Sequence, residues 1–258
     1  MARIIAIASG KGGVGKTMLV ANLGIAIAKT GKRCVMVDAD LDMANLELAL
    51  GMEGRPITLQ DVLNNEANIQ DAIYEVVENA KFVPAGISPA RLKRIDPEKL
   101  ANTIKKLEPF ADIVLLDSPA GIGKDTIACF SASKELLLIT TPTPMGVTDA
   151  YKTHIAAERM GTDVLGIVLN MIKGSHNEMK DKEISSLLEC KILARIKDDH
   201  EIRKSMLEGK PFVKEKPQLA SSKAIGNLAG ILAGETYKPG VSKESWFSRV
   251  FGFLKKKR

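Results

Sequence analysis

The sequence has few cysteines and no long hydrophobic run. Its three cysteines, Cys34, Cys129 and Cys190, lie far apart and form no Cys-x-x-Cys pair. This spacing argues against a disulfide framework and against a closed zinc site, and it fits a reducing cytosol. The first strong apolar stretch, Met18–Ala28, is too short to span a bilayer and lacks signal-peptide flanks. We therefore expect the protein to be made and kept in the cytoplasm.

Most of the chain also lacks an excess of charge. The net charge of the sequence is +6, but six lysines and arginines and one glutamate after residue 242 account for +5 of it. Residues 1–242 are therefore almost neutral, with a net charge of +1. A basic isoelectric point often indicates nucleic-acid binding, but here the basic character belongs to the end of the chain. We consider nucleic acid an unlikely partner.

Short apolar, β-branched segments alternate with helical patterns, which predicts an α/β fold with a mostly parallel, twisted sheet and helices on both faces. The predicted strands are Arg3–Ala8, Arg33–Val37, Lys81–Pro84, Ile113–Leu116, Glu135–Thr140, Leu165–Leu169 and Lys191–Ile196. The predicted helices are Lys16–Lys29, Pro97–Leu107, Val147–Met160, Glu178–Leu188, Glu201–Glu208 and Ser222–Ala233. We expect one domain over residues 1–233, a linker over 234–242 and a separate segment over 243–258.

A glycine-rich loop joins the first predicted strand to a helix, which is the context of a phosphate-binding loop. Glycines let backbone N–H groups approach phosphate oxygens, and the helix N-terminus adds positive potential. We expect Lys16 to bridge the β- and γ-phosphates of ATP and Thr17 to ligate Mg²⁺. The residues predicted to bind ATP here are Gly10, Lys11, Gly12, Gly13, Val14, Gly15, Lys16, Thr17 and Met18. The sequence thus predicts a single P-loop NTPase domain with ATPase activity.

The same loop resembles the deviant Walker A motif, which has an extra lysine inside the loop, here Lys11. This motif marks the MinD/ParA family of ATPases, and the resemblance covers the whole chain. It implies an ATP-dependent homodimer in which Lys11 reaches the partner's nucleotide. A cation on the γ-phosphate offsets charge that develops during transfer, so the resemblance makes Lys11 catalytic together with Lys16.

Two acidic segments follow predicted strands. Carboxylates at the carboxyl end of a parallel strand point into the crevice where such sheets bind ligands, which places Asp38, Asp40 and Asp117 there. The resemblance implies that Asp40 orients the attacking water, that Asp38 supports it at the metal site, and that Asp117 holds a water on Mg²⁺. Alternatively, Asp38 and Asp40 are helix-capping residues. The Asp-Ser-Pro-Ala-Gly sequence from Asp117 to Gly121 is similar to the MinD branch of the family.

The resemblance also implies contacts to the adenine base. Asn170, which follows a predicted strand, matches the family's adenine-contacting asparagine, and Pro211 and Phe212 match a stretch that lines the base. Asn170 as a plain turn residue at the end of a strand remains the alternative. The family's Ile-Pro-x-Asp turn reads Ile-Lys-Asp-Asp here, at 196–199, without its proline. The details of the adenine pocket are therefore left open.

The end of the chain predicts an amphipathic helix that binds membranes. Its apolar residues follow helical spacing, and four cations close the chain at 255–258. Such a helix binds in the plane of an anionic membrane, and its position is similar to the family's membrane-targeting helix. A helix docked on the body or used for dimerisation is the alternative. The predicted membrane-binding residues are Trp246, Phe247, Val250, Phe251 and Leu254.

These features together predict an ATP-dependent switch. We expect a cytoplasmic protein that is reversibly peripheral on the inner face of the cell membrane. We also expect it to position other proteins, as in division-site placement, with an unidentified protein partner that activates hydrolysis. The alternatives are a ParA-type partition ATPase, a regulator of flagellar or other polar structures, and an iron–sulfur carrier ATPase. The last needs paired cluster cysteines, and Cys129 is accompanied by none.

Overall fold

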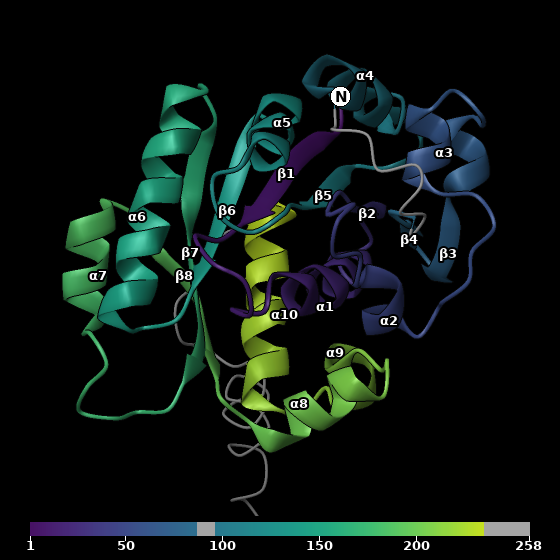
Figure 1. Ribbon diagram of the computed structural model, residues 1–258. Helices are drawn as coiled ribbons and strands as arrows, with labels where there is room; N and C mark the ends of the chain where they lie inside the picture. The colour runs from purple at the N-terminus through teal and green to yellow at the C-terminus, as the bar shows by residue number, and fades with distance from the viewer. Residues whose placement is uncertain (87–95, 235–258) are drawn as a thin grey trace, which may run out of the picture.

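One eight-stranded sheet forms the centre of the molecule in the computed structural model, which describes residues 1–86 and 96–234 (Figure 1). The strand order is β3-β4-β2-β5-β1-β6-β7-β8, and every neighbouring pair is parallel except β3 and β4. The strands are β1 (Arg3–Ala8), β2 (Cys34–Asp38), β3 (Tyr74–Val77), β4 (Ala80–Val83), β5 (Ile113–Asp117), β6 (Glu135–Thr140), β7 (Asp163–Ile172) and β8 (Ile192–Lys197). β1 therefore lies inside the sheet, between β5 and β6.

Helices cover both faces of the sheet. One face carries α1 (Lys16–Ala28), α2 (Leu46–Leu50), α8 (His200–Leu207), α9 (Phe212–Glu215) and α10 (Ala220–Leu232). The other carries α3 (Leu59–Leu63), α4 (Pro97–Lys105), α5 (Lys124–Ala132), α6 (Pro144–Arg159) and α7 (Asp181–Leu188). Within the described residues, short 3-10 helices also span Ile69–Ala72 and Glu108–Phe110. The sheet is thus the middle layer of three.

Alternation of side chains along the strands builds the two cores. Successive side chains of a strand point to opposite faces, so Ile5 and Ile7 of β1 pack beneath α1 and α10. Ala6 and Ala8 pack beneath α5 on the other face. Because both faces are covered, the strands read as almost continuous apolar runs, which is why the sequence predicts them well.

The predicted fold class is confirmed. All seven predicted strands and all six predicted helices are present, with ends shifted by a few residues. The structure adds elements that the sequence did not predict: β3, α2, α3, α5 and α9. The strand β3 pairs with β4 in antiparallel orientation at one edge of the sheet, so it contributes nothing to the carboxyl edge, where the parallel strands end.

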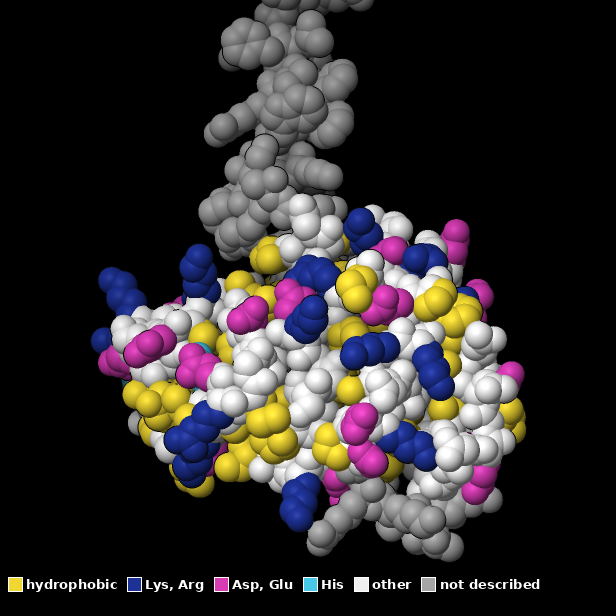
Figure 2. All heavy atoms as spheres, turned by 90° about the horizontal axis from the view of Figure 1, so that it is seen from above, with side chains coloured by type: hydrophobic (Ala, Val, Ile, Leu, Met, Phe, Trp, Pro, Cys, Tyr) yellow, Lys and Arg dark blue, Asp and Glu magenta, His cyan; other side chains and the backbone are white. Residues whose placement is uncertain are grey.

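The surface of the body matches its nearly neutral charge. Figure 2 shows lysine and arginine side chains interspersed with aspartate and glutamate over the face seen from above in Figure 1. None of the helices in residues 1–86 and 96–234 combines the length and the apolar composition that a membrane-spanning segment needs. The predicted amphipathic helix over 243–258 and the predicted linker beyond Gly234 lie outside the described residues.

Candidate nucleotide-binding site

The loop between β1 and α1 adopts a conformation that depends on its glycines. Gly13 and Gly15 have φ values of 76° and 93°, in the left-handed region that glycine enters without a steric penalty. A Cβ on Gly15 would lie 2.4 Å from the amide nitrogen of Asn170. That nitrogen donates a hydrogen bond to the carbonyl oxygen of Val14 at 2.8 Å. Asn170, on β7, therefore holds the loop from the side, in addition to any contact with a base.

A second contact holds the beginning of the loop. A Cβ on Gly10 would lie 2.3 Å from the main chain of Asp149 on α6, so only glycine fits between the loop and this helix. The Ser9 hydroxyl donates to the carbonyl oxygen of Lys11 at 2.8 Å. The Lys11 side chain is half-buried, and the following residue, Gly12, is exposed. The loop is thus fixed at its base and open at the position of the extra lysine.

The first turn of α1 faces the acidic end of β5. Lys16 is 8% exposed, and its charge lowers the pKa of Asp117. The Thr17 hydroxyl lies beside the Asp117 carboxylate and favours its charged form, which also lowers that pKa. Burial has the larger effect and raises the pKa of Asp117 to about 6, because desolvation disfavours the charged form. The structure therefore brings together the three residues that the sequence predicts around Mg²⁺ and the phosphates.

One oxygen of Asp117 is left without a partner. Among the described residues, its Oδ1 is buried and accepts no hydrogen bond. Buried polar atoms are almost always satisfied in native proteins, so a water or a metal ion from outside the chain would satisfy this oxygen. Mg²⁺ prefers oxygen ligands and keeps several of its waters. A carboxylate oxygen next to the Thr17 hydroxyl fits Mg²⁺ bound directly by Thr17 and through a water by Asp117.

Asp38 lies beside Asp117 but has another task in the fold. The two aspartates are paired in register at the ends of β2 and β5. The Asp38 carboxylate accepts hydrogen bonds from the backbone N–H groups of Asp40, Asn45 and Leu46, at 3.2, 3.1 and 3.0 Å. Burial, and then the charge of Asp117, raise the pKa of Asp38 well above its ordinary value.

Because Leu46 is the first residue of α2, Asp38 caps this short helix from the end of the neighbouring strand. The capping alternative thus describes the hydrogen bonds of Asp38, and its place at the metal site stays a prediction. Asp40 is half-buried and accepts a hydrogen bond from the Met43 N–H at 3.1 Å. It lies in the loop between β2 and α2, where its role toward water also stays a prediction.

A pocket of about 570 Å³ adjoins the phosphate loop. Its volume lies in the usual range for small-molecule sites. Asn170 lines it, and so do three residues of the turn that departs from the family pattern, Lys197, Asp198 and Asp199. Asp199 also caps α8 by accepting the Glu201 N–H at 2.8 Å. The full lining is Gly15, Met18, Asn170, Met171, Lys173, Lys197, Asp198, Asp199, Ile202, Arg203, Met206 and Leu207.

Pro211 and Phe212, predicted beside the base, do not line this pocket. Phe212 is fully buried in the core beneath α1 and α10, and Pro211 is buried as well. Ile202 and Met206 of α8 form one wall of this pocket, and the place of Pro211 and Phe212 beside the base stays a prediction. Ile202 and Met206 are four positions apart and therefore share one face of the helix, a spacing that the sequence does contain.

The geometry at the carboxyl edge of the sheet defines the class of protein. Glycines place the loop against the first turn of α1, and Asp117 meets Lys16 and Thr17 there. This arrangement of strand, glycine-rich loop, helix and carboxylate is typical of the P-loop nucleoside triphosphatases.

Comparison with known proteins places the chain within that class. The family described as the CobQ/CobB/MinD/ParA nucleotide binding domain matches residues 5–212, and the chain belongs to this family. It is an ATPase of the MinD-like, deviant Walker A type. The predicted P-loop fold and ATPase class are thereby confirmed.

The similarity extends over nearly the whole length of several relatives. An uncharacterized ATP-binding protein of Methanocaldococcus jannaschii is 40% identical over 96% of this chain and 95% of its own length. The cell division ATPase MinD of Pyrococcus furiosus is 39% identical, with a TM-score of 0.86 over 91% of this chain and 99% of that one. The septum site-determining protein MinD of Pyrococcus horikoshii, solved with Mg-ADP, is 37% identical, with a TM-score of 0.85 over 90% and 96%.

Proposed function

We propose that this chain is an ATPase that dimerises when it binds ATP, holds the membrane reversibly and positions other proteins in cell-division site placement. The observation that carries this proposal is the phosphate loop, with Lys16 and Thr17 at Asp117 and with the extra Lys11 where the loop is open. The two Pyrococcus relatives, named as a cell division ATPase and a septum site-determining protein, support the cellular role.

Binding of Mg·ATP follows from the groups around the loop. The backbone N–H groups of the loop and the Lys16 ammonium bind the phosphates, and the helix dipole of α1 favours their negative charge. Bound Mg²⁺ would neutralise charge on the β- and γ-phosphate oxygens, held by Thr17 and, through water, by Asp117. The base enters the adjoining pocket. Since the amide N–H of Asn170 bonds to Val14, its amide oxygen is the group that accepts a hydrogen bond from adenine.

Hydrolysis needs a positioned water and a stabilised transition state. Asp40 accepts a hydrogen bond from water and aims its oxygen at the γ-phosphorus. As the new O–P bond forms, the bond to the bridging oxygen of ADP breaks, negative charge shifts onto that oxygen, and a proton of the water passes to an oxygen of the phosphate product. Lys11 of a second copy of the chain lies against this charge in the dimer. A protein partner that completes the site would then set the rate of hydrolysis.

Membrane binding is assigned to the segment beyond the described body. Arg3, at the amino end of β1, makes a two-pronged ion pair with Glu135, at 2.9 and 2.8 Å, and also donates to the carbonyl oxygen of Leu232. This contact fixes the end of α10 at the edge of the sheet opposite the phosphate loop. Gly234, the last described residue, therefore lies at that edge, in the same pocket lining as Arg3. Two weak anchors held together in a dimer gain affinity through their effective concentration, which couples membrane binding to ATP.

The alternatives receive less support from the site. The sulfur of Cys129 is fully buried on α5, which does not suit a ligand of an iron–sulfur cluster shared at a surface. The face in Figure 2 carries both signs of charge interspersed, rather than the basic surface that a DNA-bound partition ATPase needs. A role at flagella or other polar structures would use the same switch, so it differs only in the partner.

Two substitutions with opposite effects test the dimer. We expect Lys11→Ala to bind Mg·ATP but stay monomeric, because the cation that bridges two copies is missing. We expect Asp40→Ala to bind Mg·ATP and accumulate as a dimer, because hydrolysis cannot release it. Lys32→Ala, at an exposed lysine far from the loop, is the matched control and should behave as wild type.

Sedimentation velocity with saturating Mg·ATP measures the outcome for each variant. A normal ATP-dependent dimer of Lys11→Ala would remove its role across the interface. An Asp40→Ala protein that is monomeric with Mg·ATP would remove the assignment of Asp40 to hydrolysis. Nucleotide binding, measured separately, distinguishes both results from a damaged site.

A further inference from the structure

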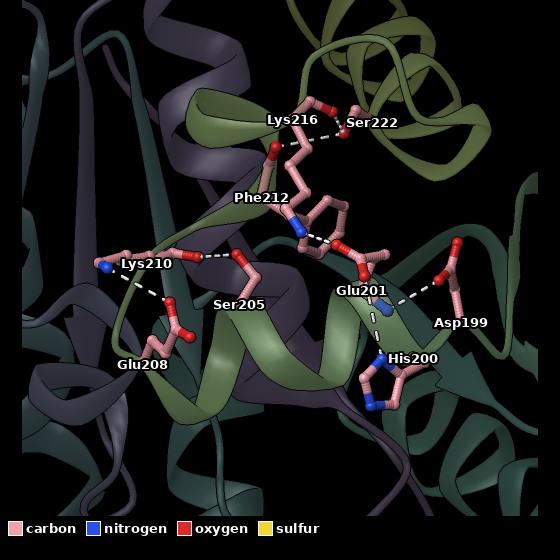
Figure 3. A network of polar contacts seen from close by, with 9 residues as sticks. All are labelled: Asp199, His200, Glu201, Ser205, Glu208, Lys210, Phe212, Lys216 and Ser222. Atoms are coloured by element: carbon pink, nitrogen blue, oxygen red, sulfur yellow. Dashed lines mark hydrogen bonds and ion pairs between the residues drawn. The ribbon is translucent and has the colours of Figure 1, made fainter.

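One wall of the base pocket is α8, and polar contacts join this helix to the segments around α9 and α10. Figure 3 shows Lys216 of the segment after α9 paired with Glu201 of α8, and Ser205 of α8 bonded to the carbonyl oxygen of Lys210. The Ser222 hydroxyl of α10 donates to the carbonyl oxygen of Lys216 at 2.7 Å. These contacts join α8 to the segments around α9 and α10.

A buried asparagine on the P-loop helix reaches α8 and α9. Asn22, on α1, is fully buried. Its amide oxygen accepts the Val213 N–H at 3.0 Å, and its amide nitrogen donates to the carbonyl oxygen of Met18 at 2.8 Å and to the sulfur of Met206 at 3.5 Å. Met18 and Met206 both line the base pocket. One side chain therefore links α1 to the wall and contacts both pocket methionines.

A second contact lies at the end of α8. Gly51, after α2, and Gly209, after α8, have φ values of 65° and 63°. A Cβ on Gly51 would lie 2.6 Å from the carbonyl oxygen of Gly209, and a Cβ on Gly209 would lie 2.9 Å from the Gly51 Cα and from the Leu48 carbonyl oxygen. The two turns thus touch backbone to backbone, at a separation that no side chain permits.

Both contacts lead to elements that start at the phosphate end of the site. α1 begins with Lys16 and Thr17, and α2 begins at Leu46, which Asp38 caps. The five residues of α2, about 7.5 Å of helix, run from Leu46, which Asp38 caps, to Gly51. The α8 wall is therefore fixed in position relative to α1, which begins at the phosphate loop, and relative to α2, which follows the acidic loop.

We propose that Asn22 and the Gly51–Gly209 contact are positioning elements that set the α8 wall against the nucleotide base. The proposal rests on the nucleotide site described above, and it assigns base recognition to residues that do not touch the base. If they position the wall, their loss weakens the binding of a nucleotide but spares a ligand that has phosphates and no base.

The test compares Mg·ATP with magnesium tripolyphosphate by titration calorimetry on the full chain. Asn22→Leu removes the polar contacts while keeping the side-chain size, and Gly209→Ala forces the two turns apart. We expect each to weaken Mg·ATP binding about tenfold, which is about 1.4 kcal/mol, and to leave tripolyphosphate binding within about twofold of wild type. Gly54→Ala is the matched control, since Gly54 has a similar φ of 78° with no atom within 4 Å of an added Cβ.

The outcomes separate this inference from the proposed function. If Asn22→Leu and Gly209→Ala weaken both ligands equally, the contacts only support the fold and the inference is wrong. The same holds if they bind both ligands as the Gly54→Ala control does. If Gly209→Ala does not fold, Asn22→Leu alone decides by the same criterion. A wild-type chain that binds no Mg·ATP would overturn the nucleotide site itself, and this inference with it.

Discussion

Replacing Lys16 with alanine is expected to weaken ATP binding about a hundredfold, or about 2.7 kcal/mol. Lys16 as a whole is 8% exposed, so its interaction with phosphate oxygens takes place largely away from bulk water, where charge-assisted hydrogen bonds are strong. Its loss also leaves Asp117 without the nearby cation that lowers its pKa. ATPase activity should fall to background, because both phosphate binding and the charge balance at the metal site are lost.

Calorimetric titration of each protein with Mg·ATP measures its affinity for the nucleotide. Lys16→Met keeps the length of the aliphatic chain, so a similar loss in that variant assigns the effect to the charge rather than to a cavity. Lys32→Ala changes an exposed lysine at the other end of the fold and should bind as wild type does. Wild-type affinity in Lys16→Ala would contradict the assignment of the loop to phosphate.

We expect Asp117→Asn to stabilise the nucleotide-free protein and to abolish its ATPase activity. Burial raises the pKa of Asp117 from its ordinary 3.8 to about 6, so the folded state binds this proton more tightly than the unfolded state does. The charged form of Asp117 therefore destabilises the folded state, and the free energy of unfolding falls as the pH rises from about 4 to about 6. The shift corresponds to about 3 kcal/mol. Asparagine mimics the neutral form and avoids this destabilisation, but it cannot support Mg²⁺.

Denaturant unfolding without Mg²⁺ or nucleotide tests the sign of this effect. The gain in unfolding free energy over wild type should be largest at neutral pH and should vanish below about pH 4, where the wild-type carboxyl is protonated in both states. Asp42→Asn, at an exposed aspartate in the loop between β2 and α2, should show no gain in unfolding free energy. An Asp117→Asn protein that is less stable than wild type at neutral pH would contradict this account. It would mean that the charge of Asp117 does not destabilise the folded state.

The parts of the fold that the sequence predicts best are those whose environment is uniform. Strands such as β1 and β5 are buried on both faces, so their apolar runs are recognisable without knowledge of their neighbours. The phosphate loop is equally local, because strand, glycines and helix follow one another directly. Lys16, Thr17 and Asp117 could therefore be brought together from the sequence alone.

The missed elements depend on distant residues. α2 has only five residues, too few to be stable alone, and its cap is Asp38, eight positions before its first residue. The strand β3 is a four-residue edge strand that forms by pairing with β4. Neither has enough periodicity of its own to be recognised from local sequence.

The base pocket is the least predictable part of the site, because it is assembled from segments far apart in the chain. The resemblance to the family predicts Phe212 beside the base, and the structure buries this side chain in the core. What the local sequence could not show is that Asn22 on α1 holds the Val213 backbone and the Met206 sulfur. The side chains that face the pocket are those of α8, the helix before Phe212, among them Ile202 and Met206.

Co-sedimentation with anionic vesicles tests the central claim, that ATP controls membrane binding through the end of the chain. The full chain and a version ending at Ser242 are compared with Mg·ATP and with Mg·ADP, on vesicles with and without anionic lipid. We expect binding only for the full chain, only with ATP and only on the anionic vesicles. Binding that ignores the nucleotide, or that persists in the version ending at Ser242, would contradict the proposed membrane switch.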